Sequence, residues 1–153
     1  MRQQAEEGAT LTGALLDLAE AGTAVTVKTN GGRTHHGTVA GVGTDFVAVR
    51  TSAQALAFVA FAAIAAVRLR PGPAARPPTG DRPAAVDLSL LEALAGAAPD
   101  RPRVLLAPHS GEALVGELRA VGKDVVTMTI EGDAKALCYV PAQSVTEVSF
   151  LPG

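Results

Sequence analysis

Short runs of alternating apolar and polar residues fill most of this chain, and glycine-rich turns separate them. Val25 and Val27 share one face of such a run, which predicts a β-strand, and the Asn-Gly-Gly segment at residues 30–32 predicts a hairpin turn. The inward-facing positions change parity near Gly41, which indicates a β-bulge. Five strands are expected in this part of the chain, over residues 23–29, 33–43, 46–51, 56–61 and 67–69.

A short helix is predicted ahead of these strands. Leucines recur at the spacing of one helical face: Leu11, Leu15 and Leu18. Thr10 or Thr12 can cap the start of this helix, and Gly22 is expected to end it.

The same series then occurs a second time. Between residues 37–50 and 116–129, five identities lie at one offset of 79 residues: Gly37 with Gly116, Val42 with Val121, Gly43 with Gly122, Asp45 with Asp124, and Val47 with Val126. An insertion of two residues then raises the offset to 81, at which Phe58 corresponds to Tyr139 and Val67 to Val148. A helix and five strands are therefore expected twice, as a tandem duplication.

The second copy also begins with a helix. Ser89 and Glu92 have the spacing of a capping box, in which each side chain binds a free backbone amide at the helix start. Apolar residues on its buried face are Leu90, Leu91 and Leu94, and Gly96 is expected to end it.

Residues 70–86 break the pattern, because they hold five of the chain's ten prolines and no apolar periodicity. This segment predicts an extended linker. The expected organisation is a frayed terminus at residues 1–9, a first unit at 10–69, the linker at 70–86 and a second unit at 87–150.

The composition limits what the protein can be. Of 153 residues, 48% are apolar and only 3% aromatic, and the net charge is −2. Cys138 is the only cysteine, so no disulfide can form within the chain. Residues 1–10 have no apolar core of a signal peptide, and the most apolar run, residues 53–67, is too short to span a bilayer. We therefore expect a cytoplasmic protein that does not enter the membrane.

A short helix followed by five bent strands, with hydrophobic-x-Gly-x-Asp at the second turn, resembles the Sm-like (LSm) fold, a small SH3-like barrel. The turn residues that carry the resemblance are Gly43 and Asp45, and again Gly122 and Asp124. The second half is also similar to uncharacterised proteins of high-GC Gram-positive bacteria. The resemblance implies a mainly β fold of two tandem five-stranded barrels, each preceded by a short α-helix.

The chain departs from RNA-binding Sm proteins at the positions that contact bases. Those proteins carry a base-reading Asn four residues after the motif Asp, where this chain has Val49 and Met128. The base-stacking position, two residues after the Asp, holds Val47 and Val126, which offer no aromatic platform. The Arg-Gly-Asp or Arg-Gly-Asn of the second Sm motif is missing from both halves. The resemblance thus implies the barrel without its usual nucleotide pocket.

No pattern in the chain predicts catalysis, a metal or a cofactor. Asp45 and Asp124 are interpreted as turn residues that accept backbone amides. His35 and His36 are neighbours in a strand, so they point to opposite faces and do not suit one metal ion. His109 is interpreted as a turn residue and Cys138 as a structural thiol in an apolar strand. The protein is therefore not expected to be an enzyme.

Arginines are the one feature that favours nucleic acid. They lie at the end of the first unit, in the linker and after the second helix: Arg68, Arg70, Arg76, Arg82, Arg101 and Arg103. Basic tracts bind phosphates by releasing counterions. Residues 86–150, however, hold five basic and nine acidic residues, and this net charge of −4 opposes the binding of a polyanion.

Strand edges give the main functional expectation. Residues 56–61 carry no charge and no proline, and an edge strand of this kind aggregates unless another strand covers it. Candidate edge residues are Leu56, Phe58, Val59 and Phe61, with Leu137, Tyr139 and Val140 in the second half. Sm-like proteins pair the fourth strand of one barrel with the fifth of the next. Here the partner strand can belong to the other repeat, to a second copy of the chain or to another protein.

Two function classes follow. The first is a non-enzymatic binding or assembly module that forms homo-oligomers or binds other proteins, with a regulatory role among its uses. The alternative is an RNA- or nucleic-acid-binding protein that uses the linker arginines instead of the standard pocket. Salt-dependent binding to a homopolymer RNA separates the two classes.

Overall fold

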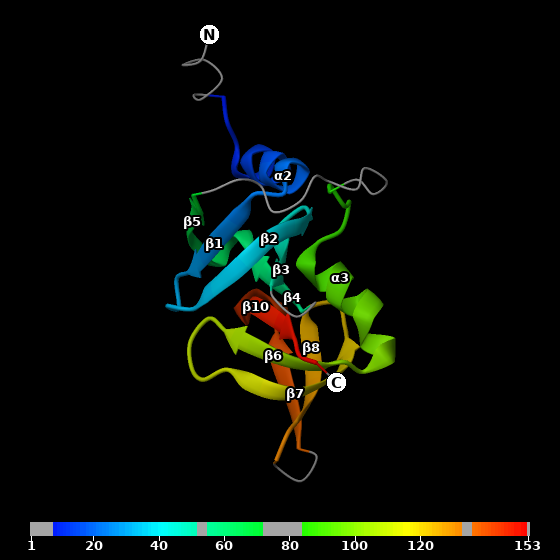
Figure 1. Cartoon of the computed structure of the whole chain (residues 1–153). Helices are drawn as coiled ribbons and strands as arrows, with labels where there is room; N and C mark the ends of the chain where they lie inside the picture. Colours follow the sequence, from blue (N-terminus) through cyan, green and yellow to red (C-terminus); the bar gives the residue numbers. More distant parts are fainter. Residues whose placement is uncertain (1–7, 52–54, 72–83, 133–135, 153) are drawn as a thin grey trace.

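The computed structural model describes residues 8–51, 55–71, 84–132 and 136–152. In these residues ten strands form one antiparallel sheet, and two α-helices lie against it (Figure 1). The expected mainly β fold class is confirmed. None of the helices in these residues is long and apolar enough to cross a membrane.

The first half, which we define as residues 10–69, contains one helix and five strands. Its elements are α2 (Leu11–Ala21), β1 (Ala24–Thr29), β2 (Thr34–Val42), β3 (Phe46–Thr51), β4 (Leu56–Ala60), the 3₁₀ turn η2 (Phe61–Ala63) and β5 (Ile64–Leu69). The strands occur where the sequence places them, except that β5 begins three residues before the predicted strand at residues 67–69.

The second half, residues 87–150, repeats this order. Its elements are α3 (Leu90–Ala97), η3 (Ala98–Asp100), β6 (Arg103–Pro108), β7 (Leu114–Val121), β8 (Val125–Ile130), β9 (Leu137–Pro141), η4 (Ala142–Ser144) and β10 (Val145–Phe150). α3, β6 and β8 begin 79 residues after α2, β1 and β3, whereas β9, η4 and β10 begin 81 residues after β4, η2 and β5. The repeat in the sequence is therefore also a repeat in secondary structure.

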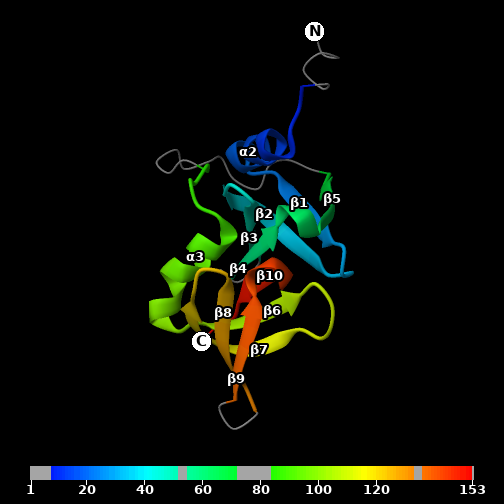
Figure 2. The ribbon, with the colours of Figure 1, turned by 180° about the vertical axis from the view of Figure 1, so that it is seen from behind.

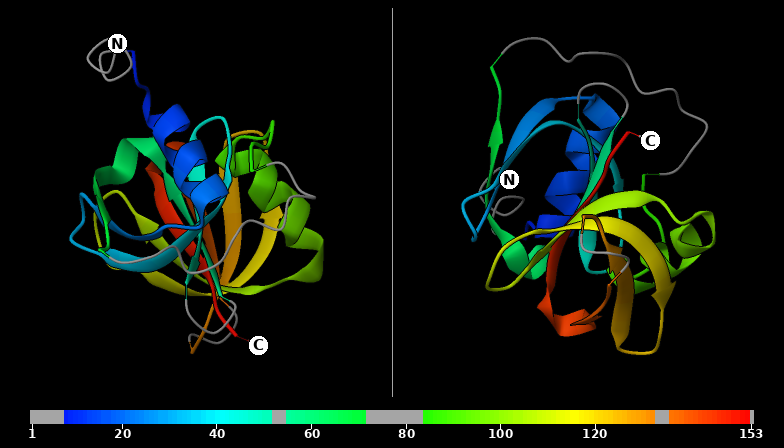
Figure 3. Two further views of the ribbon diagram at one scale, coloured as in Figure 1. Left: turned by 45° about the horizontal axis from the view of Figure 1, so that its top comes forward. Right: turned by 90° about the horizontal axis from the view of Figure 1, so that it is seen from below.

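Strand order shows how the two halves join. The sheet runs β5-β1-β2-β3-β4-β10-β6-β7-β8-β9, so each half has its fifth strand beside its first, and β4 meets β10 between the halves. The predicted bulge is confirmed, because the β2–β3 register shifts between Val39 and Gly41. The β7–β8 register shifts at the corresponding place, between Leu118 and Ala120. Figure 3 shows α2 across the first half and α3 beside the second.

Each half has its own hydrophobic core. In the first half Leu15 of α2 packs among the valines of the strands: Val25, Val27, Val39, Val42, Val47, Val49 and Val59. In the second half Leu90 and Leu94 of α3 pack with Leu106, Leu118 and Met128. Phe46 and Ala48 belong to β3 of the first half but pack in the second core. The two cores are therefore in contact across the junction.

Three of the four helix ends are capped by the residues that the sequence predicts. Thr10 Oγ1 accepts a hydrogen bond from the Gly13 amide at 3.0 Å, and Gly22 ends α2 with a φ of 66°. At α3 the predicted capping box of Ser89 and Glu92 is present.

The expectation that Gly96 ends α3 is wrong. α3 continues to Ala97 and then tightens into η3, and a Cβ at Gly96 would meet no atom within 4 Å. The chain turns instead at Arg101, whose φ of 49° lies in the left-handed region and which follows Pro99 of η3. A glycine ends a helix only where the backbone needs a positive φ, and Gly96 lies before that point.

The repeated glycines Gly37 and Gly116 have a steric cause. A Cβ on Gly37 would overlap the backbone carbonyl of Arg50 on β3, and one on Gly116 would overlap that of Thr129 on β8. Both positions thus need glycine for the close approach of two backbones.

We predict that Gly37→Ala and Gly116→Ala each destabilise the protein by about 1–3 kcal/mol or more, because the strands must separate to admit a methyl group. The matched control is Gly96→Ala, which should stabilise the protein by roughly 0.5–1 kcal/mol through helix propensity. Urea unfolding followed by circular dichroism measures both effects. Equal stability of all three variants would contradict the steric explanation.

Candidate functional site

The junction between the halves is an antiparallel strand pair. Across it Val59 of β4 lies opposite Glu147 of β10, and Phe58 lies opposite Val148. β10 of the same chain therefore covers β4, the strand that contains the candidate edge residues Leu56, Phe58 and Val59. The fourth candidate, Phe61, begins η2 just after this strand.

An aromatic cluster fills one face of the junction. The ring centroid of Phe58 lies 5.0 Å from that of Phe46 and 4.9 Å from that of Phe150, with tilted and edge-to-face geometry. Such pairs contribute about 0.5–1.5 kcal/mol each beyond the area that they bury. Because Phe58 comes from β4 and Phe150 from β10, the cluster holds the two halves together.

A polar cluster occupies the opposite face. Glu147 is 1% exposed, and its Oε1 lies 2.7 Å from Nε2 of His35 and 2.9 Å from Nε of Arg33. His35 is on β2, and Arg33 directly precedes that strand, so both partners come from the first half. A buried carboxylate is costly unless it is paired, and here the pairing requires both halves in their observed positions.

The environment of Glu147 sets its pKa. Burial, the largest influence, raises the pKa of this carboxyl, but the hydrogen bond and charge of His35 and the charge and hydrogen bond of Arg33 together outweigh it. The net pKa lies below the ordinary value of 4.5. The cluster therefore favours an ionised Glu147 at neutral pH.

A cleft of about 550 Å³ opens beside this cluster, between the turns of the two halves. Its lining includes Asn30, Gly31 and Arg33 from the first half, and the turn that follows β6, with His109, from the second. Arg33 and Glu147 also reach this cleft, but they are paired with each other. The backbone amide of His109 donates to the Ser144 carbonyl at 2.6 Å, which agrees with a turn role for this residue.

Asp45 acts across the junction and not within its own turn. Its Oδ1 accepts a hydrogen bond from the backbone amide of Leu90, the first residue of α3, at 2.7 Å. The Thr44 amide also donates to the Leu88 carbonyl at 2.8 Å. Asp45 therefore accepts a backbone amide, as the sequence suggested, but one from the second half. The carboxylate also suits the positive end of the helix.

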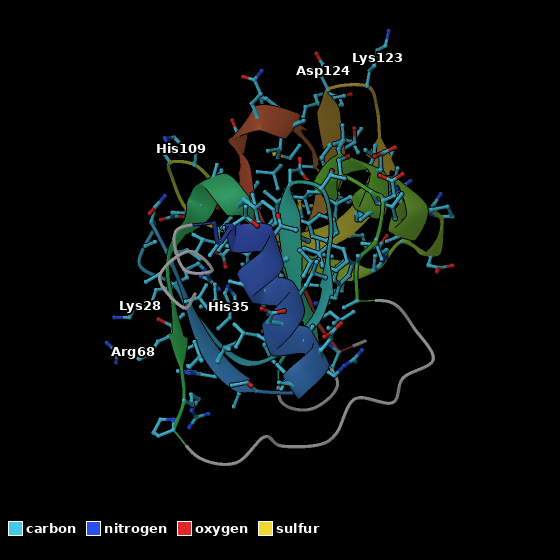
Figure 4. All side chains as sticks on the ribbon, turned by 90° about the horizontal axis from the view of Figure 1, so that it is seen from above. Lys28, His35, Arg68, His109, Lys123 and Asp124 are labelled. Carbon is cyan, nitrogen blue, oxygen red and sulfur yellow. The ribbon has the colours of Figure 1, made fainter. Side chains whose placement is uncertain are left out.

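The glycine before this turn is needed for the same contact. A Cβ on Gly43 would lie 2.6 Å from the carbonyl oxygen of Leu88 and would overlap the ring of Phe46. Its counterpart Gly122 is less crowded, with the nearest atom, a methyl of Val125, at 3.0 Å. Asp124, the counterpart of Asp45, is exposed at the corresponding turn (Figure 4).

The two outermost strands of the sheet, β5 and β9, each have one neighbour among the described strands. They lie at opposite ends of the molecule (Figure 2). Large apolar side chains are exposed on them: Leu69 on β5, and Leu137 and Tyr139 on β9. The third candidate edge residue of β9, Val140, is buried. Exposed apolar groups on strands that are paired along only one edge mark β5 and β9 as candidate interaction sites.

The candidate arginines lie in separate places. Arg68 is exposed on β5, and Arg70 follows that strand, whereas Arg76 and Arg82 lie outside the described residues. A second group lines a groove of the second half, where Arg101, Arg103 and Arg119 alternate with three acidic residues: Asp100, Glu117 and Glu131. Arg103 is paired with Glu131 at 3.0 Å. This groove therefore carries balanced charge.

The histidines and the cysteine occupy structural positions. His35 is buried against Glu147, whereas His36 is exposed and hydrogen-bonds Thr26 at 2.9 Å, as expected for neighbouring residues of a strand. Cys138 is half-buried on β9 and packs against the second core. In the part of the chain that the structure describes, no group of three or more His, Cys, Asp or Glu side chains could hold a metal ion.

Comparison of the chain with protein-family models, with curated proteins and with solved structures gives no match. The site must therefore be interpreted from its own geometry. The sequence pointed to β4 and β9 as candidate edge strands, but it did not point to β5 or to the polar cluster. Glu147 follows its partners by more than a hundred residues, and only its place as the one charged residue of β10 sets it apart.

We predict that Glu147→Gln destabilises the protein at pH 7 by about 1–3 kcal/mol, because Arg33 and His35 lose the carboxylate with which they pair. Glu131→Gln, which removes an exposed ion pair, is the control and should change stability by less than about 1 kcal/mol.

The same cluster predicts a pH dependence. Since the pKa of Glu147 is lowered in the folded state, its contribution is present above the unfolded pKa and is lost as the pH falls through the folded pKa. The difference in unfolding free energy between wild type and Glu147→Gln should therefore shrink below about pH 4. A difference that stays constant from pH 7 to pH 3 would show that the carboxylate charge is not stabilising.

Proposed function

We propose that this protein is a non-enzymatic assembly module, built of two tandem Sm-like barrels and joining other barrels edge to edge. One observation carries the proposal. Inside the chain, β4 of the first half pairs with β10 of the second, which are the fourth strand of one repeat and the fifth of the other. The outer edges are the remaining fifth strand, β5, and the remaining fourth strand, β9.

The buried positions of the motif support a protein partner. Val47, Val49, Val126 and Met128 occupy the positions that contact bases in RNA-binding Sm proteins, and each is 0% exposed. Side chains in the core cannot stack on a base or read its edge. The balanced groove around Arg103 adds no net positive charge. These observations favour assembly over nucleic-acid binding.

The edges themselves support strand pairing. β5 and β9 are six and five residues long, and their exposed apolar side chains would be covered by a partner strand. Natural edge strands are commonly protected by charges or proline, and here only Arg68 and Pro141 provide this. Backbone hydrogen bonds and apolar burial together favour addition of a strand at each edge.

We predict that the protein self-associates at micromolar concentration in light scattering and that Tyr139→Lys weakens this association at least tenfold. A lysine in place of the tyrosine would have to be buried without a partner at the paired edge. The matched control is Ala40→Lys, which places the same charge at an exposed position on β2, between β1 and β3.

A strictly monomeric protein at high micromolar concentration would contradict assembly through these edges. Titration with a uridine homopolymer at low and high salt tests the alternative. Tight, salt-dependent binding that Tyr139→Lys leaves unchanged would favour the nucleic-acid function instead.

A further inference from the structure

We propose that the partner at each edge is a second copy of this chain, docked head to tail, with β9 of one copy paired to β5 of the next. In this junction the carboxylate of Asp124 in the first copy accepts a hydrogen bond from the backbone amide at the start of α2 in the second copy. The inference rests on the proposed assembly function and specifies its partner, its register and its helix contact. It follows from the internal repeat. The junction between β4 and β10 within the chain is a template for the contacts that their counterparts β9 and β5 can make with another copy.

Corresponding residues of the two repeats differ in side-chain exposure where one repeat contacts the other half and its counterpart has no such contact. Leu90, at the start of α3, is 7% exposed, whereas its counterpart Leu11, at the start of α2, is 42% exposed. One turn further on, Leu94 and Leu15 are equally buried at 1%. The helices thus pack alike on their own halves, and only the residue that faces a neighbouring half differs.

Strand residues show the same difference. Phe58 and Phe150 are half-buried against each other at the internal junction. Their counterparts are exposed at opposite ends of the chain, with Tyr139 at 68% and Leu69 at 57%. Three of the exposed large apolar residues, Leu11, Leu69 and Tyr139, are therefore counterparts of residues that the internal junction covers.

The internal junction also gives the register. β4 and β10 align Val59 with Glu147, Phe58 with Val148, and Ala57 with Ser149. With the offset of 81 residues, β9 and β5 of two copies align Val140 with Ala66, Tyr139 with Val67, and Cys138 with Arg68. Ser149 is half-buried, so Arg68 in its place can extend its guanidinium towards water.

The helix contact transfers in the same way. Asp45 binds the amide of Leu90 across the internal junction, and the counterparts of these residues are Asp124 and Leu11. The Asp124 turn lies next to the end of β9, because its carbonyl accepts a hydrogen bond from Ala142 at 2.8 Å. Figure 4 shows Asp124 and the β5 residue Arg68 at well-separated places. One copy therefore cannot join these two ends by itself.

The polar cluster distinguishes the two kinds of junction. At a β9–β5 junction Ala66 takes the place of Glu147, and Leu114 takes that of His35. This junction is apolar and buries no carboxylate. If β10 lay against β9 instead, Glu147 would face Leu114 and Glu112, the counterparts of its two partners. The fifth strands are thus not interchangeable, because an unpaired buried carboxylate is strongly unfavourable.

Net charge favours the head-to-tail order. Residues 10–69 hold four basic and three acidic residues, a net charge of +1, whereas residues 87–150 hold five and nine, a net charge of −4. A symmetric contact between two β9 edges would bring two acidic halves together, whereas β9 on β5 joins unlike halves. Such a heterologous contact propagates until it closes into a ring or continues as a filament.

The native Cys138 allows a direct test in the full chain. Arg68→Cys places a thiol opposite Cys138 of the next copy, at a separation typical of facing residues on paired strands. Under mild oxidation we expect a ladder of disulfide-linked species beyond the dimer and a linked peptide pair that contains residues 68 and 138. Lys28→Cys, an exposed cysteine one strand inward on β1, is the matched control and should give no ladder.

The outcomes separate the two proposals. A ladder with the 68–138 link supports the head-to-tail register. Association in light scattering without this link, or with only symmetric 68–68 or 138–138 links, overturns the register but leaves the assembly function standing. Absence of association overturns both.

Asp124→Ala tests the helix contact. Loss of a capping carboxylate should weaken association about five- to tenfold, and the neighbouring exposed change Lys123→Ala should not. Unchanged association of Asp124→Ala with the 68–138 link still formed would overturn the helix contact alone.

Discussion

Antiparallel pairing of β4 with β10 is the interaction on which the rest of the structure depends. It converts two repeated halves into one ten-stranded sheet and brings Phe46 and Ala48 of the first half into the core of the second. Phenylalanine contacts stabilise one face of the pairing, and the Glu147 cluster occupies the other. Without this pairing, both β4 and β10 would be unprotected strand edges.

The Glu147 cluster makes the internal junction specific. A buried carboxylate adds little net stability even when paired, but it strongly disfavours any arrangement in which its partners are absent. Arg33 and His35 come from one half and Glu147 from the other, and none of the three has a like counterpart at the outer edges. This asymmetry lets two similar repeats keep a fixed order, which a duplication with identical edges would lack.

Local patterns predicted the elements well, because their causes lie within a few residues. Thr10, Gly22 and the Ser89–Glu92 pair act on their own helix ends, and the bulge near Gly41 reflects the parity of a single strand. The prediction that Gly96 ends α3 was wrong because a glycine in a helical run does not by itself end the helix. The contacts of Asp45 with Leu90 and of Glu147 with His35 join residues 45 and 112 positions apart. A single sequence holds no local signal for such pairs, so the junction became visible only in the fold.

Within one chain β4 is covered by β10, while β5 and β9 each keep one edge open to a partner strand. Amide hydrogen exchange across a range of protein concentrations measures this difference between the strands. We predict slow exchange for the β4 and β10 amides at every concentration, together with fast exchange in β5 and β9 that slows as the concentration rises. Amides of β4 that exchange as fast as those of β5 and β9 in dilute solution would contradict this prediction.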